Sequence, residues 1–316
     1  MKTLIILAVG VAIIFGVTLW RAAQREAAAV QTFPPEGQLI EVEGRTVHVV
    51  IQGDGPDVVL IHGSSGNTRD FTFDYAGDLA ATGYRVLTMD RAGLGHSDPL
   101  PPEATSIFDQ ARLLQAAAAQ LGADAPIVVG QSYGGSVALA WAVDMPDRLS
   151  AVVSLAGASQ VWEGPAPALY RTIRTPVVGE LFLPFLTAWV PDSYVQSSIE
   201  GIFAPQEAIP GYGEYVGAPL SITRSALRST ASQRVTLKSE IASMVPRYPD
   251  IAVPIELVHG DADTIVPLQI HAGPFKEQVP AATLTVLPGV GHMPQHVSQD
   301  AVTAAIDRAA VAAGLK

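Results

Sequence analysis

The sequence has no cysteine among its 316 residues. This absence excludes thiol nucleophiles, disulfide frameworks, zinc sites built from cysteine, and iron–sulfur clusters. Any covalent catalysis must therefore use a hydroxyl, a carboxylate or an amine as its nucleophile.

Basic side chains are also few, because 19 Lys and Arg stand against 30 Asp and Glu, which gives a formal net charge of −11. A protein that binds nucleic acid needs a basic face to neutralise phosphates, so we expect no nucleic-acid partner. Charged residues make up only 16% of the chain and hydrophobic residues 48%. This composition is typical of a protein with a sizeable core and excludes a disordered chain.

One long hydrophobic run lies near the N-terminus, from Thr3 to Trp20, and basic residues flank it on both sides. As a helix, these 18 uncharged residues rise about 27 Å, close to the hydrocarbon thickness of about 30 Å of a bilayer. We predict a transmembrane anchor or signal segment over residues 1–22 and a linker over residues 23–37.

Residues 27–29, three consecutive alanines, satisfy the small-x-small pattern of a signal-peptide cleavage site. A cleaved signal peptide and a secreted protein are therefore the alternative to an anchor. The hydrophobic run is longer than most signal-peptide cores, which favours an uncleaved single-pass anchor and makes the membrane a partner of the protein. The short positive N-terminus favours a main domain that faces the periplasm or the outside.

Short hydrophobic runs alternate with amphipathic stretches along the rest of the chain. Continuous runs rich in β-branched residues are typical of strands buried on both faces. A hairpin is expected over residues 39–42 and 46–51, and further strands over 58–61, 86–89, 127–129, 152–155, 255–258 and 284–287. Helices are expected over residues 107–121, 133–143 and 299–312. The alternation predicts an α/β protein with a doubly wound, mostly parallel sheet of eight strands.

One interval, from Gly157 to Ile251, contains no clear strand but ten prolines and ten aromatic residues. We interpret it as a helical cap with an apolar underside that covers one end of the sheet. The predicted organisation is therefore a first core part over 38–157, a helical cap over 158–250 and a second core part over 251–316.

The chemistry of the chain centres on Ser132, which lies in the pattern Gly-Gln-Ser-Tyr-Gly after the hydrophobic run 127–129 and before a predicted helix. In this strand–turn–helix setting a strained turn pushes the serine hydroxyl out of the sheet. The flanking glycines fit such a turn because a side chain there would collide with the neighbouring strand and helix.

A nucleophilic serine needs a base, and that base needs a carboxylate to fix its tautomer. Among seven histidines, His292 lies in a glycine-bracketed loop after a predicted strand, where catalytic groups collect in α/β sheets. Asp261 and Asp263 compete as the acid; we favour Asp263, with Asp261 in a turn as the alternative. We expect structural hydrogen bonds for His62 and His259, a surface or packing position for His48, and a place outside the pocket for His296.

These features together resemble the serine α/β-hydrolases of the cap-bearing, single-domain group over about residues 38 to 314. The motifs are His62-Gly63-Ser64-Ser65-Gly66, Asp90-Arg91-Ala92-Gly93-Leu94-Gly95-His96-Ser97, the serine turn, Gly260-x-x-Asp263-x-x-Val266-Pro267 and Gly291-His292-x-Pro294. The resemblance implies a catalytic triad of Ser132, Asp263 and His292. Ala92, where relatives have Pro or Gly, and Val297, where they often have Glu, depart from the family pattern.

The same resemblance implies an oxyanion hole made by the backbone N–H groups of Ser64 and Tyr133. We expect acyl transfer to water, with hydrolysis of a hydrophobic carboxylic ester as the reaction. Neither a cofactor nor a metal is indicated, since Gly53-Asp54-Gly55 and Gly93-Leu94-Gly95 lack the rest of a phosphate-binding fingerprint.

Several alternatives use the same three residues. Hydrolysis of a carbon–carbon bond in a vinylogous diketone, proline iminopeptidase action and perhydrolysis all occur on related scaffolds. Serine as the nucleophile argues against dehalogenase and epoxide hydrolase chemistry, which use a carboxylate. A hydrolase-like protein that binds a ligand without turnover is the alternative outside enzymes. The sequence leaves the substrate, the membrane orientation and the oligomeric state open.

Overall fold

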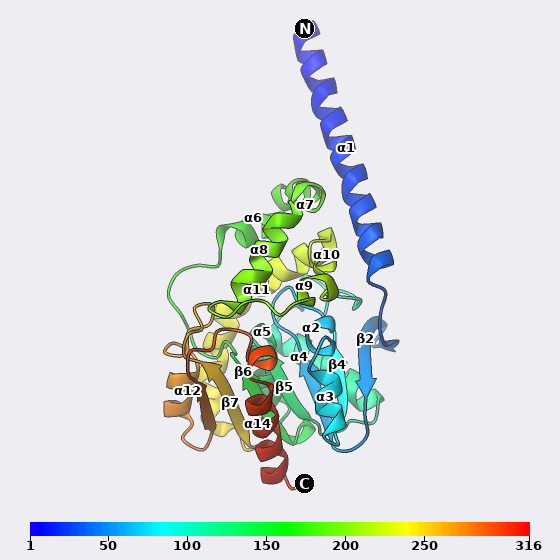
Figure 1. The fold of residues 1–316 in the computed structure, drawn as a ribbon. Helices are drawn as coiled ribbons and strands as arrows, with labels where there is room; N and C mark the ends of the chain where they lie inside the picture. Colours follow the sequence, from blue (N-terminus) through cyan, green and yellow to red (C-terminus); the bar gives the residue numbers. More distant parts are fainter.

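A computed structural model describes residues 1–316, and its centre is one eight-stranded sheet in the order β1-β2-β4-β3-β5-β6-β7-β8 (Figure 1). The strands are β1 (Gln38–Val42), β2 (Arg45–Gln52), β3 (Asp57–Ile61), β4 (Arg85–Met89), β5 (Ile127–Gln131), β6 (Ala151–Leu155), β7 (Ile255–Gly260) and β8 (Thr283–Leu287). β1 pairs antiparallel with β2, and β2 with β4, whereas all other pairs are parallel. The predicted fold class is confirmed.

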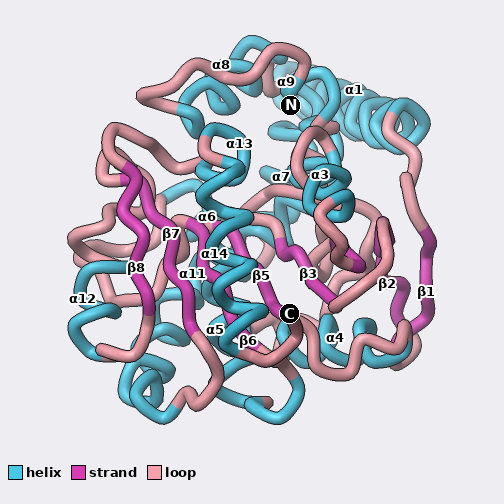
Figure 2. The backbone as a smooth tube through the Cα atoms, turned by 60° about the horizontal axis from the view of Figure 1, so that its bottom comes forward, coloured by secondary structure: helices cyan, strands magenta, loops and turns pink.

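The central strands are hydrophobic without alternation because helices cover both faces of the sheet, and every residue of β5, β6 and β7 is buried. The helices on one face are α4 (Ile107–Gln120), α5 (Tyr133–Asp144) and α12 (Ala272–Gln278). Those on the other face are α3 (Ala76–Ala81) and α14 (Gln299–Ala312), of which α14 lies across the sheet in Figure 2. Short helical segments are α2 (Arg69–Thr72), the 3-10 turn Pro146–Arg148 and α13 (Pro294–Val297).

The chain between β6 and β7 forms a helical cap above the carboxyl ends of the parallel strands (Figure 1). Its helices are α6 (Ala168–Arg174), α7 (Val178–Trp189), α8 (Asp192–Phe203), α9 (Tyr212–Tyr215), α10 (Ala218–Ser221) and α11 (Arg224–Met244), followed by the 3-10 segment Val245–Asp250. The longest, α11, packs against α6 and α7 above and against α4 and α5 below. It therefore connects the cap with the core.

The N-terminal helix α1 (Lys2–Thr32) is longer than the sequence predicts, and its N-terminal half projects away from the body of the protein (Figure 1). Residues 23–32, which we predicted as part of a linker, are helical. The reason is their composition, because Ala, Gln and Glu are good helix formers and no Gly or Pro interrupts them. The helix ends at Phe33, before the first proline at position 34. Only residues 33–37 form the connection to β1.

Candidate active site

Ser132 lies in a sharp turn between β5 and α5, with φ 54° and ψ −117°. A non-glycine residue with positive φ is strained, and such strain is typical of functional turns. The glycines on either side are sterically required. A Cβ on Gly130 would lie 2.1 Å from the carbonyl oxygen of Gly134, and a Cβ on Gly134 would lie 2.3 Å from that of Ile61. Only the sequence Gly-x-Ser-x-Gly lets the helix approach the sheet this closely.

The structure brings the three predicted residues together. Nε2 of His292 lies 2.9 Å from Oγ of Ser132, and Nδ1 of His292 lies 2.7 Å from Oδ2 of Asp263. Asp263 and His292 are buried, with 4% and 5% of their surface exposed, whereas Ser132 is partly accessible. Burial shields the His–Asp interaction from water and leaves the hydroxyl as the part of the chain of contacts that a substrate can reach.

Asp263 is held in a fixed orientation by the backbone. Its Oδ1 accepts hydrogen bonds from the N–H groups of Ile265 and Val266, which leaves Oδ2 for His292. Burial raises the pKa of this carboxyl, but hydrogen bonds from His259, His292 and the backbone outweigh burial, and the pKa lies well below its usual value. The group is therefore a carboxylate at neutral pH.

Asp261, the alternative acid, has a different task. Its Oδ1 accepts a hydrogen bond from the N–H of Gly289 at 2.6 Å, and no contact joins it to His292. It thus holds the loop that leads from β8 to His292. Asp261 and Asp263 are only two residues apart in the sequence, but they contact opposite ends of that loop, Gly289 and His292.

Gln131, the residue before the nucleophile, was not singled out in the sequence. Its Nε2 donates to the backbone carbonyl of His292 at 3.0 Å, so β5 fixes both the serine and the loop that bears the histidine. Its Oε1 is so close to Gly63 that a Cβ there would lie 2.2 Å from it. No periodicity or spacing marks a glutamine for this role, because the contact depends on a loop 161 residues away.

The two expected oxyanion donors line the same cavity as Ser132. Tyr133 is the first residue of α5, so its N–H lacks an acceptor within the helix. The N–H of Ser64, in the loop after β3, donates to no group of the protein. Both amides are therefore free to bind a ligand oxygen beside the serine hydroxyl.

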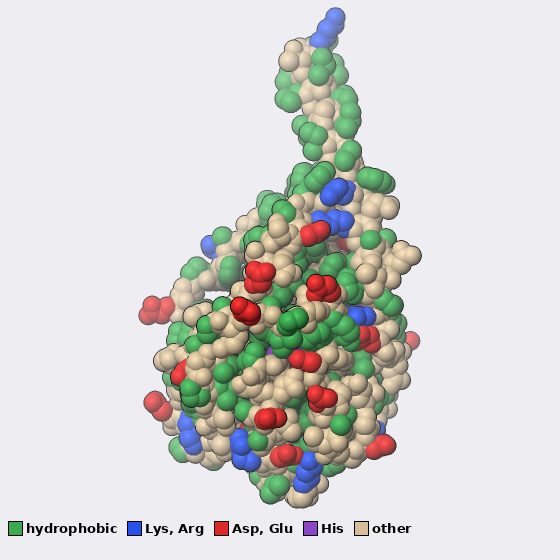
Figure 3. Space-filling model, viewed as in Figure 1, with side chains coloured by type: hydrophobic (Ala, Val, Ile, Leu, Met, Phe, Trp, Pro, Cys, Tyr) green, Lys and Arg blue, Asp and Glu red, His purple; other side chains and the backbone are tan.

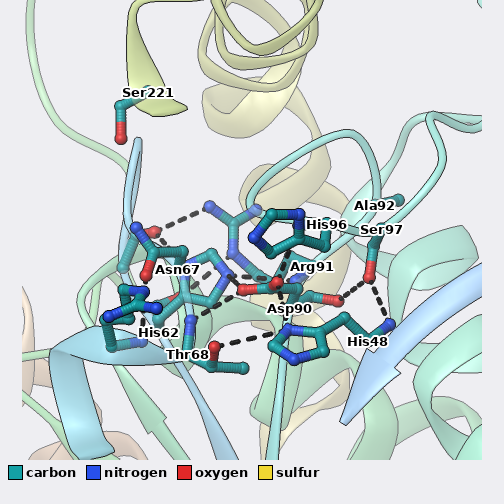
Figure 4. A network of polar contacts seen from close by, with 12 residues as sticks. His48, His62, Asn67, Thr68, Asp90, Arg91, Ala92, His96, Ser97 and Ser221 are labelled. Atoms are coloured by element: carbon teal, nitrogen blue, oxygen red, sulfur yellow. Dashed lines mark hydrogen bonds and ion pairs between the residues drawn. The ribbon is translucent and has the colours of Figure 1, made fainter. Parts of the chain in front are cut away.

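Arg91 is fully buried next to the loop that contains Ser64. Figure 4 shows it within a network of polar contacts. Its guanidinium donates to the carbonyl oxygens of His62 and Gly63, at 3.0 and 2.8 Å, directly before Ser64. Burial lowers the pKa of Arg91 to about 10, so the group stays charged at neutral pH. The side-chain oxygens of Gln110 and Gln233 accept its remaining hydrogen bonds at 2.7 Å. An arginine directly after a buried strand was the available sequence signal for this role.

The neighbouring Asp90 organises the loops around Arg91 (Figure 4). It accepts hydrogen bonds from the N–H groups of Thr68 and His96 and from Nδ1 of His48, at 2.7, 2.8 and 2.7 Å. His48 is thus buried and hydrogen-bonded to Asp90, which corresponds to the packing position and not to the surface position. His62 has the expected structural role, because its Nε2 accepts from the N–H of Arg91.

The other histidines lie outside the triad. His259 bonds to the carbonyl oxygen of Val266. His296 lies beneath the cap, where its two ring nitrogens contact Asp70 and Asp74 at 3.0 and 2.6 Å. Burial alone lowers the pKa of His296, but the two carboxylates raise it to about 9. This histidine joins α13 to α2 and the residues after it, within the core, and it does not contact Ser132.

Two cavities meet at Ser64. The first has a volume of about 650 Å³ and contains Ser132, Trp162, Arg234 and His271 in its wall. The second, of about 590 Å³, lies inside the cap, and Ser64 is the only residue that lines both. Such volumes suit small organic ligands. No group of three or more His, Asp or Glu side chains in the structure has a metal-binding arrangement.

Comparisons with known proteins identify the family of the chain. The model of the family described as "Alpha/beta hydrolase family" matches residues 58–306, which is most of the chain. The chain therefore belongs to that family. Haloalkane dehalogenase 2 of Mycobacterium tuberculosis is 25% identical over 295 residues, which cover 87% of this chain and 97% of that protein. The 2-hydroxy-6-oxo-6-phenylhexa-2,4-dienoate hydrolase of Burkholderia cepacia is 26% identical over 262 residues, 81% of this chain and 87% of that protein.

Among solved structures, an esterase from Exiguobacterium antarcticum superimposes with a TM-score of 0.69 at 20% identity. The match covers 86% of this chain and 98% of the esterase. At this identity the likeness establishes the fold, and the hydrolase relatives support an enzymatic activity without specifying the bond that is cleaved.

Proposed function

We propose that the protein is a serine hydrolase that cleaves carboxylic esters through an acyl-enzyme. The observation that carries this proposal is the chain of contacts from Asp263 through His292 to Ser132, at 2.7 and 2.9 Å, at the wall of an accessible cavity. A buried carboxylate, a histidine oriented by it and a hydroxyl that a substrate can reach are the parts of an activated serine.

The reaction proceeds in two halves. Nε2 of His292 takes the proton of Ser132 while Oγ attacks the ester carbonyl, and the tetrahedral intermediate then collapses as the same nitrogen protonates the departing alcohol. Water next loses a proton to His292 and attacks the acyl-enzyme, which releases the acid and restores the serine. Asp263 stays ionised throughout and stabilises the imidazolium.

The free N–H groups of Ser64 and Tyr133 receive the negative charge that develops on the carbonyl oxygen. Each such donor contributes about 3 kcal/mol to lowering the barrier. Because backbone amides carry out this task, the identity of the side chain at position 64 matters little, whereas the conformation of the loop matters greatly.

Serine at position 132 separates this chain chemically from the dehalogenase that it resembles. Displacement of a halide by a serine oxygen would give an ether, which neither the triad nor water can cleave. A carboxylate nucleophile would give an ester, which water can hydrolyse. Ester substrates therefore suit the residues of this site and haloalkanes do not.

The test uses the full-length protein in detergent with p-nitrophenyl butyrate as the substrate. We expect hydrolysis by the wild-type protein, loss of more than about 1,000-fold in Ser132→Ala, and covalent labelling of Ser132 by a fluorophosphonate. Ser239→Ala, an exposed serine on α11, is the matched control. Wild-type turnover in Ser132→Ala would exclude the triad, and absence of labelling would favour a binding protein without turnover.

A second candidate is hydrolysis of a carbon–carbon bond, because the Burkholderia cepacia relative is named for such a substrate. That substrate carries a carboxylate, and Arg234 is the one arginine in the wall of the cavity that contains Ser132, where no lysine is present. Turnover of a vinylogous diketone acid that depends on Arg234, combined with poor turnover of esters, would favour this reaction.

A further inference from the structure

The N-terminal helix is fastened to the cap along one face. Thr18 and Ala22 of α1 are completely buried and Ala29 nearly so, a spacing of four and seven residues that follows one side of the helix. The rings of Phe15 and Phe185 lie 6.1 Å apart, which brings α1 against α7. Helix α1 therefore packs against the cap along this face.

Polar contacts complete this attachment. Nε of Arg21 donates to the carbonyl oxygen of Ala188 at 2.7 Å, and Nη1 of Arg25 donates to that of Val190 at 2.8 Å. These carbonyls belong to the end of α7 and would otherwise lack a partner. Cleavage after Ala29 would remove both arginines and with them these contacts between α1 and the cap.

Helix α7 is hydrophobic on two sides. Leu183, Thr187 and Ala188 face the cap and are buried. Val178 and Leu181 lie on the outside and are 50% and 53% exposed. Phe185 and Trp189 continue this face at helical spacing, and each is partly covered by α1 and otherwise exposed. The polar side chains of α7 lie away from this outer face, because Thr187 is buried and Glu180 pairs with Arg228 of α11. An apolar face that remains exposed on a helix is suited to a membrane. Figure 3 shows this end of the cap continuous with the hydrophobic surface of α1.

The length of α1 indicates that the bilayer reaches the end of α7 that contacts α1. Only residues 2–14 precede the first aromatic contact with the cap, at Phe15, and they rise about 20 Å. A helix needs about 20 residues to cross a hydrocarbon core of about 30 Å. The part of α1 inside the bilayer therefore extends from Lys2 to about Arg21. Trp20 and Trp189 then lie near the boundary, and tryptophan is enriched at membrane–water interfaces. The guanidinium carbon of Arg21 lies 4.7 Å from the centroid of the Trp189 ring.

The cap cavity lies between this boundary and the cavity that contains Ser132, and it shares lining residues with both regions. Val190 and Pro191 line both the cavity and the groove between α1 and the start of α8. At its inner end the cavity contains Ser64, which also lines the cavity of Ser132. No charged side chain lines it, and most of its wall is hydrophobic. Its surface is therefore suited to a hydrocarbon chain.

We propose that the outer face of α7 is immersed in the bilayer beside α1 and that the cap cavity takes the hydrocarbon chain of a lipid ester directly from the membrane. The inference rests on the proposed ester hydrolysis and specifies its substrate class. The ester carbonyl reaches Ser132 past Ser64, water supplies the hydroxyl group of the released fatty acid, and the alcohol leaves with the proton of His292.

Immersion of α7 is tested first, without reference to activity. Because the protein lacks cysteine, Leu181→Cys introduces a single thiol that can carry an environment-sensitive fluorophore. In full-length protein reconstituted into phosphatidylcholine vesicles, we expect brominated lipids to quench this label. The same label at Val311→Cys, an exposed site on α14, should remain unquenched. Equal behaviour of the two labels would overturn the proposal.

The substrate class is tested in the same vesicles with a long-chain fluorogenic glyceride in the bilayer and p-nitrophenyl butyrate in the water. In Leu181→Glu we expect the ratio of the glyceride rate to the butyrate rate to fall at least about tenfold, because a charge on this face resists immersion. Val311→Glu should keep the wild-type ratio. An unchanged ratio in Leu181→Glu would contradict the proposal.

Occupancy of the cap cavity is tested with Val195→Trp, which fills it from α8. We expect the preference for p-nitrophenyl palmitate over butyrate to fall at least about tenfold. An unchanged preference would mean that the hydrocarbon chain of the substrate occupies the cavity of Ser132 and not the cap cavity, against the proposal. Failure of the wild-type protein to cleave any ester would count against the proposed function. Intact butyrate hydrolysis with no effect of Leu181→Glu or Val195→Trp would count against the lipid substrate alone.

Discussion

The guanidinium of Arg91 lies over the ring of Tyr133, with 4.3 Å between its central carbon and the ring centroid. The same guanidinium holds the carbonyl oxygens of His62 and Gly63. Arg91 thus contacts both the loop before Ser64 and the start of α5 at Tyr133, the two segments whose backbone N–H groups are free at the cavity. A cation–π contact and two hydrogen bonds fix the distance between these segments, which a charge alone would not achieve.

The first prediction concerns Arg91→Lys, which keeps the positive charge and loses the planar fork. We expect kcat for p-nitrophenyl butyrate to fall about 10- to 100-fold with little change in KM, because misplaced amides weaken stabilisation of the transition state. Steady-state kinetics measures both constants. A rise in KM with an unaltered kcat would instead indicate a role in substrate binding.

The second prediction compares the two neighbouring aspartates. Asp263→Asn removes the charge that orients His292 and should lower kcat by about 10³- to 10⁴-fold. Asp261→Asn retains an oxygen that can accept from Gly289 and should change kcat by less than about threefold. The same kinetic assay on both variants decides which carboxylate serves the triad, and a reversed order would exclude Asp263.

The third prediction concerns the pH dependence of stability. The pKa of His296 is raised to about 9, so its pairing with Asp70 and Asp74 is fully present below the ordinary histidine value near 6.5. Its contribution is lost as pH rises through about 9. We expect His296→Gln to lower the free energy of unfolding by about 3 kcal/mol at pH 7.

Urea denaturation in detergent at several pH values measures this effect. The difference between wild-type protein and His296→Gln should shrink as pH rises from about 7 to 10, because the wild-type histidine then loses its proton. A difference that is constant over this range would mean that the histidine acts through packing alone.

The fourth prediction concerns the serine turn. Gly134→Ala places a methyl group 2.3 Å from the carbonyl oxygen of Ile61, where only movement of backbone can relieve the contact. We expect both lower stability and loss of Ser132 labelling. Gly201→Ala, on an exposed part of α8 with open space around it, should instead stabilise the protein by about 0.5 to 1 kcal/mol. Thermal unfolding and fluorophosphonate labelling report on the two variants.

Local sequence patterns predicted the strands of the sheet, the last helix and the positions of two residues of the candidate site. The helix expected over residues 299–312 has those bounds in α14, and the buried strands follow from their unbroken β-branched runs. Ser132 and His292 could be found because each lies next to glycines at the end of a strand. Their neighbours in the sheet bring them together.

Features that depend on distant packing were not accessible in this way. Residues 23–32 become helical beyond the predicted membrane segment and pack beside the cap, where Glu26 forms an ion pair with Arg224. Gln131 and His296 gain their partners from segments more than 160 residues away along the chain. No periodicity in the sequence records such contacts.

Ser64 is the only residue shared by the walls of the two cavities, and this has a consequence for selectivity. Residues of the cap, mainly from α8 to α10, line one cavity, and the segments 161–167 and 265–271 line much of the other. Under the proposed ester hydrolysis, the two halves of the substrate would be recognised by these different parts of the chain. Substitutions in one wall leave the other wall intact. Preference for the acid and preference for the alcohol can therefore change independently, by mutation in evolution or by design.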